Sequence, residues 1–547
     1  MKNNKEVSKI KNYDDEFFFL IFAIIISIFL STIYHYIPRI VGDGLVISGF
    51  IEYPDHPSLM RETNSTSFTL LAFFSAVILK ISNSIFFTSK IIIFLNTMLF
   101  ALGFLYLIFG ITRSKLFSAL IMVIILFLDI KSGGGDYPTF YFSEHINGSL
   151  SFSLFTFFLG TFLIKKLTLS GFTLGLFFTI HPVTSAWLFL HLSILFIFFK
   201  IKKINMLDKA FFIGLLLGIL TFCLFFIFYK FITYQNSIFI WPTQNKEFMY
   251  DFIKDFDWHR GLSDIYLKVN IFILATSIFL LIILNQIKDN KNLFFILALI
   301  IFLNFSGQIT FFISRLYFDL FPMIIKNIMP TRFLTFCSPI LIPLLISIIY
   351  KILNENYLSK NRFYLKHNYL LTLILSIFLI VPFLKTDRII LIKKNIINKK
   401  EIYNLQKIST DNPFWEKLRK IKTTGHLIIL GDKSTNKNYI YYISLKPLLL
   451  DATSLNFLPY FPHLSGYFKE VLEEVYGFQI NKLKDKDKNT SNFPTETVIN
   501  HFKNLDENKW HTIKTKYNVS GLVLDKNVKL KIEPYLIGKN LNFYLFN

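Results

Sequence analysis

Acidic side chains lie just beyond the first long apolar stretch of the chain, where a membrane span would give way to water. The segment "YHYIPRIVGDGLVISGFIEYPDHPSL" (34–59) carries Asp43, Asp55 and His56. Glycines flank Asp43, and glycine lets a backbone approach a ligand closely. A carboxylate held there could deprotonate an acceptor hydroxyl or amine as a general base. The alternative is an ordinary turn aspartate.

A second acidic segment, "KSGGGDYPTFYFSEHINGS" (131–149), contains Asp136, Glu144 and His145. Paired acids of this kind could serve acid/base chemistry or hold a divalent cation. Their spacing matches no strong metal signature, so the sequence defines neither a metal nor another cofactor. The alternative is a solvated loop with a helix cap. Further along, His181 ends an apolar run, where it could bind phosphate or a sugar hydroxyl or be purely structural.

Cationic and aromatic side chains occur together in two later segments. Trp258, His259 and Arg260 are consecutive in "DFDWHRGLSD", and Arg332 lies in "MPTRF". Arginine forks onto phosphate oxygens, and an aromatic face can stack on a sugar ring. These residues therefore suit a phosphorylated sugar, although Trp and Arg also serve as anchors at the membrane interface.

The composition predicts that these residues are positioned by membrane-spanning helices. Of 547 residues, 53% are hydrophobic and only 17% are charged, against about a quarter in soluble proteins. A span needs roughly 20 apolar residues, and many stretches meet or approach that length. The net charge of +22 comes largely from lysines and arginines in short loops between apolar runs. No basic stripe interleaved with aromatic residues indicates a nucleic-acid partner.

We expect a mainly α, polytopic protein with about eleven spans and a cytoplasmic N-terminus, because four lysines precede the first span. The first outer loop would cover 38–88 and contain an interfacial helix at 67–81, which could instead be a true span. This assignment places the densest basic loops inside and the acidic loops outside. The expected spans are 17–36, 90–111, 115–130, 148–164, 168–181, 183–199, 209–229, 269–286, 293–312, 333–350 and 369–384.

The chain divides into a transmembrane domain, 1–386, and a polar extracytoplasmic domain, 387–547. The second part alternates short apolar runs with helical patterns, which is typical of a small α/β domain. Strands are expected at 426–432, 446–452 and 520–526, and helices at 465–477 and 496–505.

This layout resembles the GT-C superfamily of integral-membrane glycosyltransferases, which includes protein O-mannosyltransferases and lipid A aminoarabinose transferases. Their first-loop aspartate follows the first span closely, as Asp43 does. "DHPSL" (55–59) stands where many members have a Pro-rich stretch, and "TRSK" matches a basic turn after their second span. "GFTLGLFFTIHP" (171–182) is similar to their Gly-rich helix. Many members have an acidic pair at the first-loop position, whereas Gly44 follows Asp43 here.

The resemblance implies an inverting transferase in the inner membrane that moves a sugar from a polyprenyl-phosphate carrier to a lipid, glycan or protein acceptor. Asp43 would be the base, Asp136 or Glu144 a second acid, and Arg260 and Arg332 the phosphate binders. Asp55 and His56 would shape the approach to the interfacial helix or the acceptor groove, and a divalent metal ion could take part. The alternatives are a polysaccharide ligase or polymerase, and a flippase or transporter of lipid-linked glycans.

Overall fold

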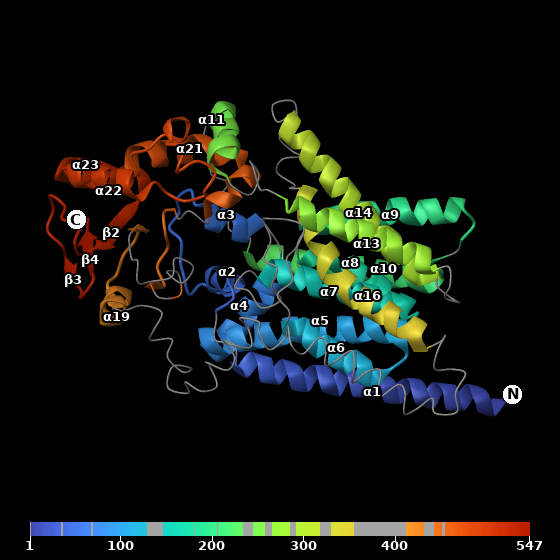
Figure 1. The fold of residues 1–547 in the computed structure, drawn as a ribbon. Helices are drawn as coiled ribbons and strands as arrows, with labels where there is room; N and C mark the ends of the chain where they lie inside the picture. Colours follow the sequence, from blue (N-terminus) through green and yellow to red (C-terminus); the bar gives the residue numbers. More distant parts are fainter. Residues whose placement is uncertain are drawn as a thin grey trace.

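The computed structural model describes most of the chain. The described residues are 2–33, 37–66, 69–127, 146–180, 182–204, 206–233, 244–257, 265–284, 291–317, 330–354, 412–430, 442, 444–450 and 454–546. Within these ranges the protein is mainly helical and has one small sheet region (Figure 1).

Seven helices in the described part of the chain are long and apolar enough to cross a membrane, or up to eight if one bent pair is a single span. They are α1 (Lys2–Ile33), α5 (Ile85–Thr112), α9 (Pro182–Ile201), α10 (Lys209–Thr233), α13 (Leu267–Leu284), α14 (Lys291–Leu316) and α16 (Cys337–Leu353). Their exposed surfaces are rich in Phe, Leu and Ile, which suits contact with lipid. This is the pattern of a membrane protein.

The other expected spans differ from these seven. Three of them form shorter apolar helices, α6 (Lys115–Phe127), α7 (Ile146–Leu163) and α8 (Leu167–Leu176). At 1.5 Å per residue, α8 is only about 15 Å long, which is half of a bilayer core. The expected span at 369–384 lies outside the described residues, so a total of eleven spans stays a prediction.

Two glycine pairs hold α8 against α10. Gly171 and Gly175 of α8 meet Gly214 and Gly218 of α10, and a Cβ added at Gly214 would lie 1.9 Å from the carbonyl oxygen of Thr168. Glycines spaced four apart allow the backbones of two membrane helices to pack this closely. The Gly-rich run at 171–182 therefore serves helix packing.

Contacts between turns define a basic end of the helix bundle. Lys166, in the turn between α7 and α8, pairs with Glu16 of α1 at 2.6 Å. Asn292, at the start of α14, donates to the carbonyl of Phe162 near the end of α7. The rings of Phe199 in α9 and Phe295 in α14 are 5.5 Å apart. One end of the bundle therefore holds Lys115, Lys166, Lys200 and Lys291. We call it the basic end. Its cytoplasmic location stays a prediction.

The opposite end carries three short helices: α2 (Ile40–Ile47), α3 (Leu59–Thr66) and α4 (Leu70–Ser82). The helix expected at 67–81 corresponds to α4, whereas α2 and α3 lie where the sequence predicts loop. The α3 and α4 axes differ by 98°. The Thr69 hydroxyl caps α4 by accepting from the Ala72 N–H. At about 20 Å, α4 is too short to cross a bilayer alone. An interfacial position for α4 stays a prediction, and a broken span through α3 and α4 is the alternative geometry.

The C-terminal sheet region lies beyond this second end, away from the N-terminus (Figure 1). Its strands are β1 (His426–Ile429), β2 (Val519–Asp525), β3 (Leu536–Ile537) and β4 (Leu541–Leu545), in the order β1-β2-β4-β3. β1 and β2 are parallel, and β4 is antiparallel to β2 and β3. The expected strand at 446–452 contributes a single bridge, from Leu448 to Leu427.

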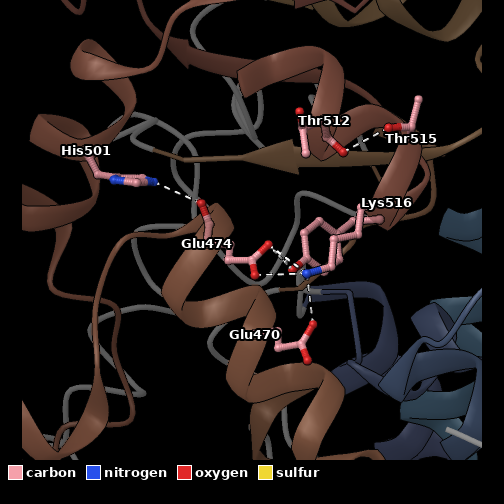
Figure 2. A network of polar contacts seen from close by, with 7 residues as sticks. Glu470, Glu474, His501, Thr512, Thr515 and Lys516 are labelled. Atoms are coloured by element: carbon pink, nitrogen blue, oxygen red, sulfur yellow. Dashed lines mark hydrogen bonds and ion pairs between the residues drawn. The ribbon is translucent and has the colours of Figure 1, made fainter. Parts of the chain in front are cut away.

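Helices cover this sheet: α19 (Asn412–Lys420), α21 (Ser465–Glu470), which continues into the π-turn η9 (Val471–Val475), α22 (Thr495–Asn504) and α23 (Glu507–Tyr517). Figure 2 shows how η9 and α23 are tied together. Lys516 pairs with Glu470 at 3.0 Å and with Glu474 at 2.9 Å, and the Tyr517 hydroxyl donates to Glu474. His501 contacts the Glu474 carbonyl. These contacts are within one packed unit and have a structural role.

The hydrophobic core of the sheet region also takes in residues from earlier in the chain. It includes Phe248 of α11 (Lys246–Asp251), Phe252 and Phe256 of η2 (Phe252–Phe256), and Leu59 of α3. The Tyr442 hydroxyl donates to the carbonyls of Pro38 and Arg39, each at 3.0 Å. The sheet region is therefore built onto the α2–α3 end of the bundle. The expected boundary at 386 lies outside the described residues.

Candidate functional site

Asp43 lies in the middle of α2, where its glycine neighbours serve helix packing. A Cβ at Gly44 would lie 2.5 Å from the Ser75 hydroxyl of α4, and one at Gly42 would lie 3.3 Å from the Tyr442 hydroxyl. Neither glycine has a positive φ; among the described glycines, only Gly49 and Gly477 do. A close approach of this backbone to a ligand stays a prediction. In the structure the two glycines bring α2 against α4 and the sheet region.

The Asp43 carboxyl group is surrounded by protein, although the residue keeps part of its surface accessible. Burial raises its pKa from 3.8 to about 6, while the positive charge of Arg39 and a hydrogen bond from the Asn64 side chain oppose the rise. Desolvation dominates because the buried group loses its hydration in the charged form. Asp43 can therefore exchange a proton near neutral pH.

The last turns of α10 hold α3 beside Asp43. The Asn64 side chain donates to the Met60 carbonyl at 2.9 Å, which fixes the amide within α3. The buried Tyr229 donates through its hydroxyl to the Asn64 carbonyl, and the Lys230 ammonium donates to the Ser65 carbonyl. The charge of Asp43 also acts on Tyr229. We call Arg39, Asp43, Asn64, Tyr229 and Lys230 the Asp43 cluster.

This arrangement combines a base with cations. A carboxyl group that titrates near neutral pH suits general-base catalysis, and perturbed pKa values tend to cluster at functional sites. Arg39 and Lys230 add positive charge at the same end of the bundle. Glu62 of α3 lies within electrostatic range of Lys230 and Arg61, so further charged groups surround the cluster.

Asp55 and His56 connect the segment before α3 to its surroundings. Asp55, 77% exposed at its side chain, pairs with Arg61 at 3.0 Å. His56 Nδ1 lies 3.1 Å from the Tyr467 hydroxyl in the sheet region, and its ring centroid lies 6.2 Å from that of the buried His426. Burial and the nearby His56 lower the pKa of His426 to about 3. These contacts favour an anchoring role, while a substrate-binding role for Asp55 and His56 stays a prediction.

Of the remaining predicted site residues, one is described. Arg332 is half-buried in the 3₁₀ turn η3 (Pro330–Phe336), which packs on α9, α14 and α16. The others lie outside the described residues: Asp136, Glu144, His145, His181, Trp258, His259 and Arg260. Within the described ranges no group of three or more His, Cys, Asp or Glu side chains could hold a metal ion. A divalent metal therefore stays a prediction that depends on the undescribed segments.

Four members of the Asp43 cluster were not predicted from the sequence as site residues. Arg39 reads as part of a loop, and Asn64 is visible only as the first residue of an Asn-Ser-Thr triplet. Tyr229 and Lys230 mark the end of an apolar run, and a lysine is ordinary at such an end. Tyr229 and Lys230 contact the backbone of Asn64 and Ser65, and each pair is separated by 165 residues of sequence.

No protein family model, curated protein or solved structure matches the chain.

Proposed function

We propose that this chain is a membrane glycosyltransferase that moves a sugar from a polyprenyl-phosphate carrier to an acceptor on the outer face of the membrane. The supporting observation is the Asp43 carboxyl group, partly accessible, with a pKa raised to about 6 by burial, at one end of an apolar helix bundle. A carboxyl group whose pKa is shifted this far by burial is a functional-site hypothesis. The proposal includes a GT-C-like arrangement of about eleven spans with the basic end in the cytoplasm.

In this mechanism Asp43 takes the proton from the acceptor hydroxyl or amine. The acceptor atom then attacks the anomeric carbon of the sugar, and the bond from that carbon to the carrier phosphate oxygen breaks. The polyprenyl phosphate leaves with the bonding electron pair, so a single displacement inverts the anomeric centre. Asp43 suits the first step because its pKa of about 6 leaves it mostly ionised at neutral pH yet basic enough to accept a proton.

The leaving phosphate gains negative charge as the reaction proceeds. Cations that meet this charge stabilise the transition state more than the ground state. Arg39 and Lys230 have the charge and the position for this role at the end of α10 where Asp43 lies. Arg260 and Arg332 are proposed as further phosphate binders, and Asp136 or Glu144 as a second acid.

The test is transfer by the purified full-length protein in lipid nanodiscs. The protein is incubated with a panel of polyprenyl-phosphate sugars, and mass spectrometry follows the release of carrier phosphate together with the glycosylated acceptor. Surface glycans of a strain that lacks the protein identify the acceptor class. We expect at least one donor to be consumed by the wild type and none by Asp43→Asn. The active control is Asp485→Asn, because that side chain is 99% exposed and lies outside the proposed site. Movement of the intact donor across the bilayer without sugar transfer would instead establish a transporter.

A further inference from the structure

A second feature lies at the basic end of the bundle: an apolar cleft of about 450 Å³ between α8, α9 and α10. Phe189, Leu192 and Phe196 line it from α9, and Phe211 and Leu215 line it from α10. This volume falls within the roughly 300–1,000 Å³ of small-molecule sites. The cleft is therefore large enough to hold part of a ligand, and its apolar lining suits a hydrocarbon chain.

The lining of the cleft follows α9 and includes exposed apolar side chains. It extends from Phe189 to Lys200, a separation of about 16 Å along the helix axis. Ile197 of α9 and Phe212 of α10 line it and are still 60% and 56% exposed. An apolar cleft of this length with exposed apolar side chains at its rim fits a single acyl chain.

The rim at the basic end is positively charged. Lys200 lines the cleft, Lys203 follows in the exposed turn, and Lys209 begins α10. The acid of this turn, Asp208, accepts a hydrogen bond from the Phe211 N–H at 3.1 Å and so caps α10. Positive charge therefore prevails at the end of the cleft where a lipid headgroup would lie.

This cleft is distinct from the Asp43 cluster. Lys209 begins α10, whereas Tyr229 and Lys230 lie in its last turns. The twenty residues from Lys209 to Tyr229 correspond to about 30 Å of helix. A sugar donor that reacts at Asp43 would hold its phosphate at the opposite end of α10, so a headgroup bound at Lys200 would belong to a different molecule.

We propose that the cleft binds one anionic diacyl phospholipid of the bilayer, with an acyl chain along α9 and the phosphate against Lys200 and Lys203. Basic pockets between membrane helices bind anionic headgroups in this way. The apolar lining selects a lipid over free phosphate, and the lysines select an anionic lipid over a zwitterionic one. A lipid held there would fill the space between α9 and α10 and support the packing of α8 on α10.

Native mass spectrometry of the full-length protein in detergent tests this proposal. The protein is titrated with palmitoyl-oleoyl phosphatidylglycerol or with phosphatidylcholine of the same chains. We expect one copy of phosphatidylglycerol to be retained at energies that strip phosphatidylcholine. Lys200→Gln should lower the phosphatidylglycerol affinity about fivefold, whereas Lys165→Gln, an exposed lysine elsewhere at the basic end, should leave it unchanged.

A second pair of variants blocks the cleft without changing charge. Ser193 lines the cleft and is half-buried, so Ser193→Trp should exclude the lipid. The adjacent Ile194 is 44% exposed and does not line the cleft, so Ile194→Trp should bind normally. Equal retention of the two lipids, or wild-type affinity in both Lys200→Gln and Ser193→Trp, would overturn the proposal. Displacement of phosphatidylglycerol by an equal amount of undecaprenyl phosphate would overturn it as well, because the occupant would then be a carrier lipid.

Discussion

Replacing Asp43 by asparagine should remove activity and, at neutral pH, stabilise the folded protein. The folded state holds Asp43 with a pKa of about 6, against an ordinary value of 3.8. That difference corresponds to about 3 kcal/mol, which is the free energy lost by keeping the charged carboxylate in its buried position. Asparagine has nearly the same shape and no charge, so the variant avoids this loss. Part of the Asp43 surface is accessible to solvent, so about 3 kcal/mol is an upper value.

The sign of the effect depends on pH. Below about pH 3.8 the carboxyl group is protonated in both folded and unfolded states, and it does not destabilise the fold. Between pH 3.8 and about 6 only the unfolded state ionises freely, so the contribution of Asp43 to the stability of the wild type falls as the pH rises. Above about pH 6 the loss is complete and constant. The stability gained by Asp43→Asn should therefore be greatest above pH 6 and disappear near pH 3.8.

The assay is thermal unfolding of both proteins in detergent, followed by tryptophan fluorescence across this pH range. The control is Asp55→Asn, because its carboxyl group is 77% exposed and an exposed ion pair contributes about 0–1 kcal/mol. The argument that burial raises the pKa of Asp43 would be refuted by a stability gain for Asp43→Asn that is the same at pH 4 and pH 7.5. A loss of stability at pH 7.5 would refute it as well.

Three further predictions follow from the contacts. His426 alone should contribute a loss of up to about 5 kcal/mol of stability as the pH falls from 6.5 to 3, because the unfolded chain protonates the imidazole while the folded state resists it. This contribution is opposite in sign to that of Asp43, so it is measured by fluorescence as the difference in stability between the wild type and His426→Leu, which should fall over this range. Gly214→Val should destabilise the protein by about 1–3 kcal/mol by overpacking, whereas Leu216→Val on the exposed side of α10 should change the melting temperature little. Tyr229→Phe removes a buried hydrogen bond and should cost about 1 kcal/mol, with slower sugar transfer because α3 is less firmly held.

The long helices could be predicted from the sequence because each depends on local hydrophobicity. The expected run at 209–229 corresponds to α10, Lys209–Thr233, and 293–312 corresponds to α14, Lys291–Leu316. A continuous apolar stretch near 20 residues has few other stable forms in a bilayer. The expected strands at 426–432 and 520–526 also match β1 and β2.

The meeting of distant polar residues could not be predicted in the same way. Tyr442 reaches Pro38 across 404 residues of sequence, and no periodicity specifies such a pair. The short strands β3 and β4 were not predicted, although Gly538 and Asn540 between them form a turn signal. The glycine spacing of "GFTLG" and "GLLLG" is the sequence signal for the pairing of α8 with α10.

The pH dependence of kcat/KM for sugar transfer tests the central proposal most directly. For the wild type we expect the rate to fall as the pH drops below about 6, because protonated Asp43 cannot accept the acceptor proton. Asp43→Asn should be slower by about 100- to 10,000-fold and should show no inflection near pH 6. Transfer by Asp43→Asn at the wild-type rate, with the same pH profile, would contradict the assignment of Asp43 as the base.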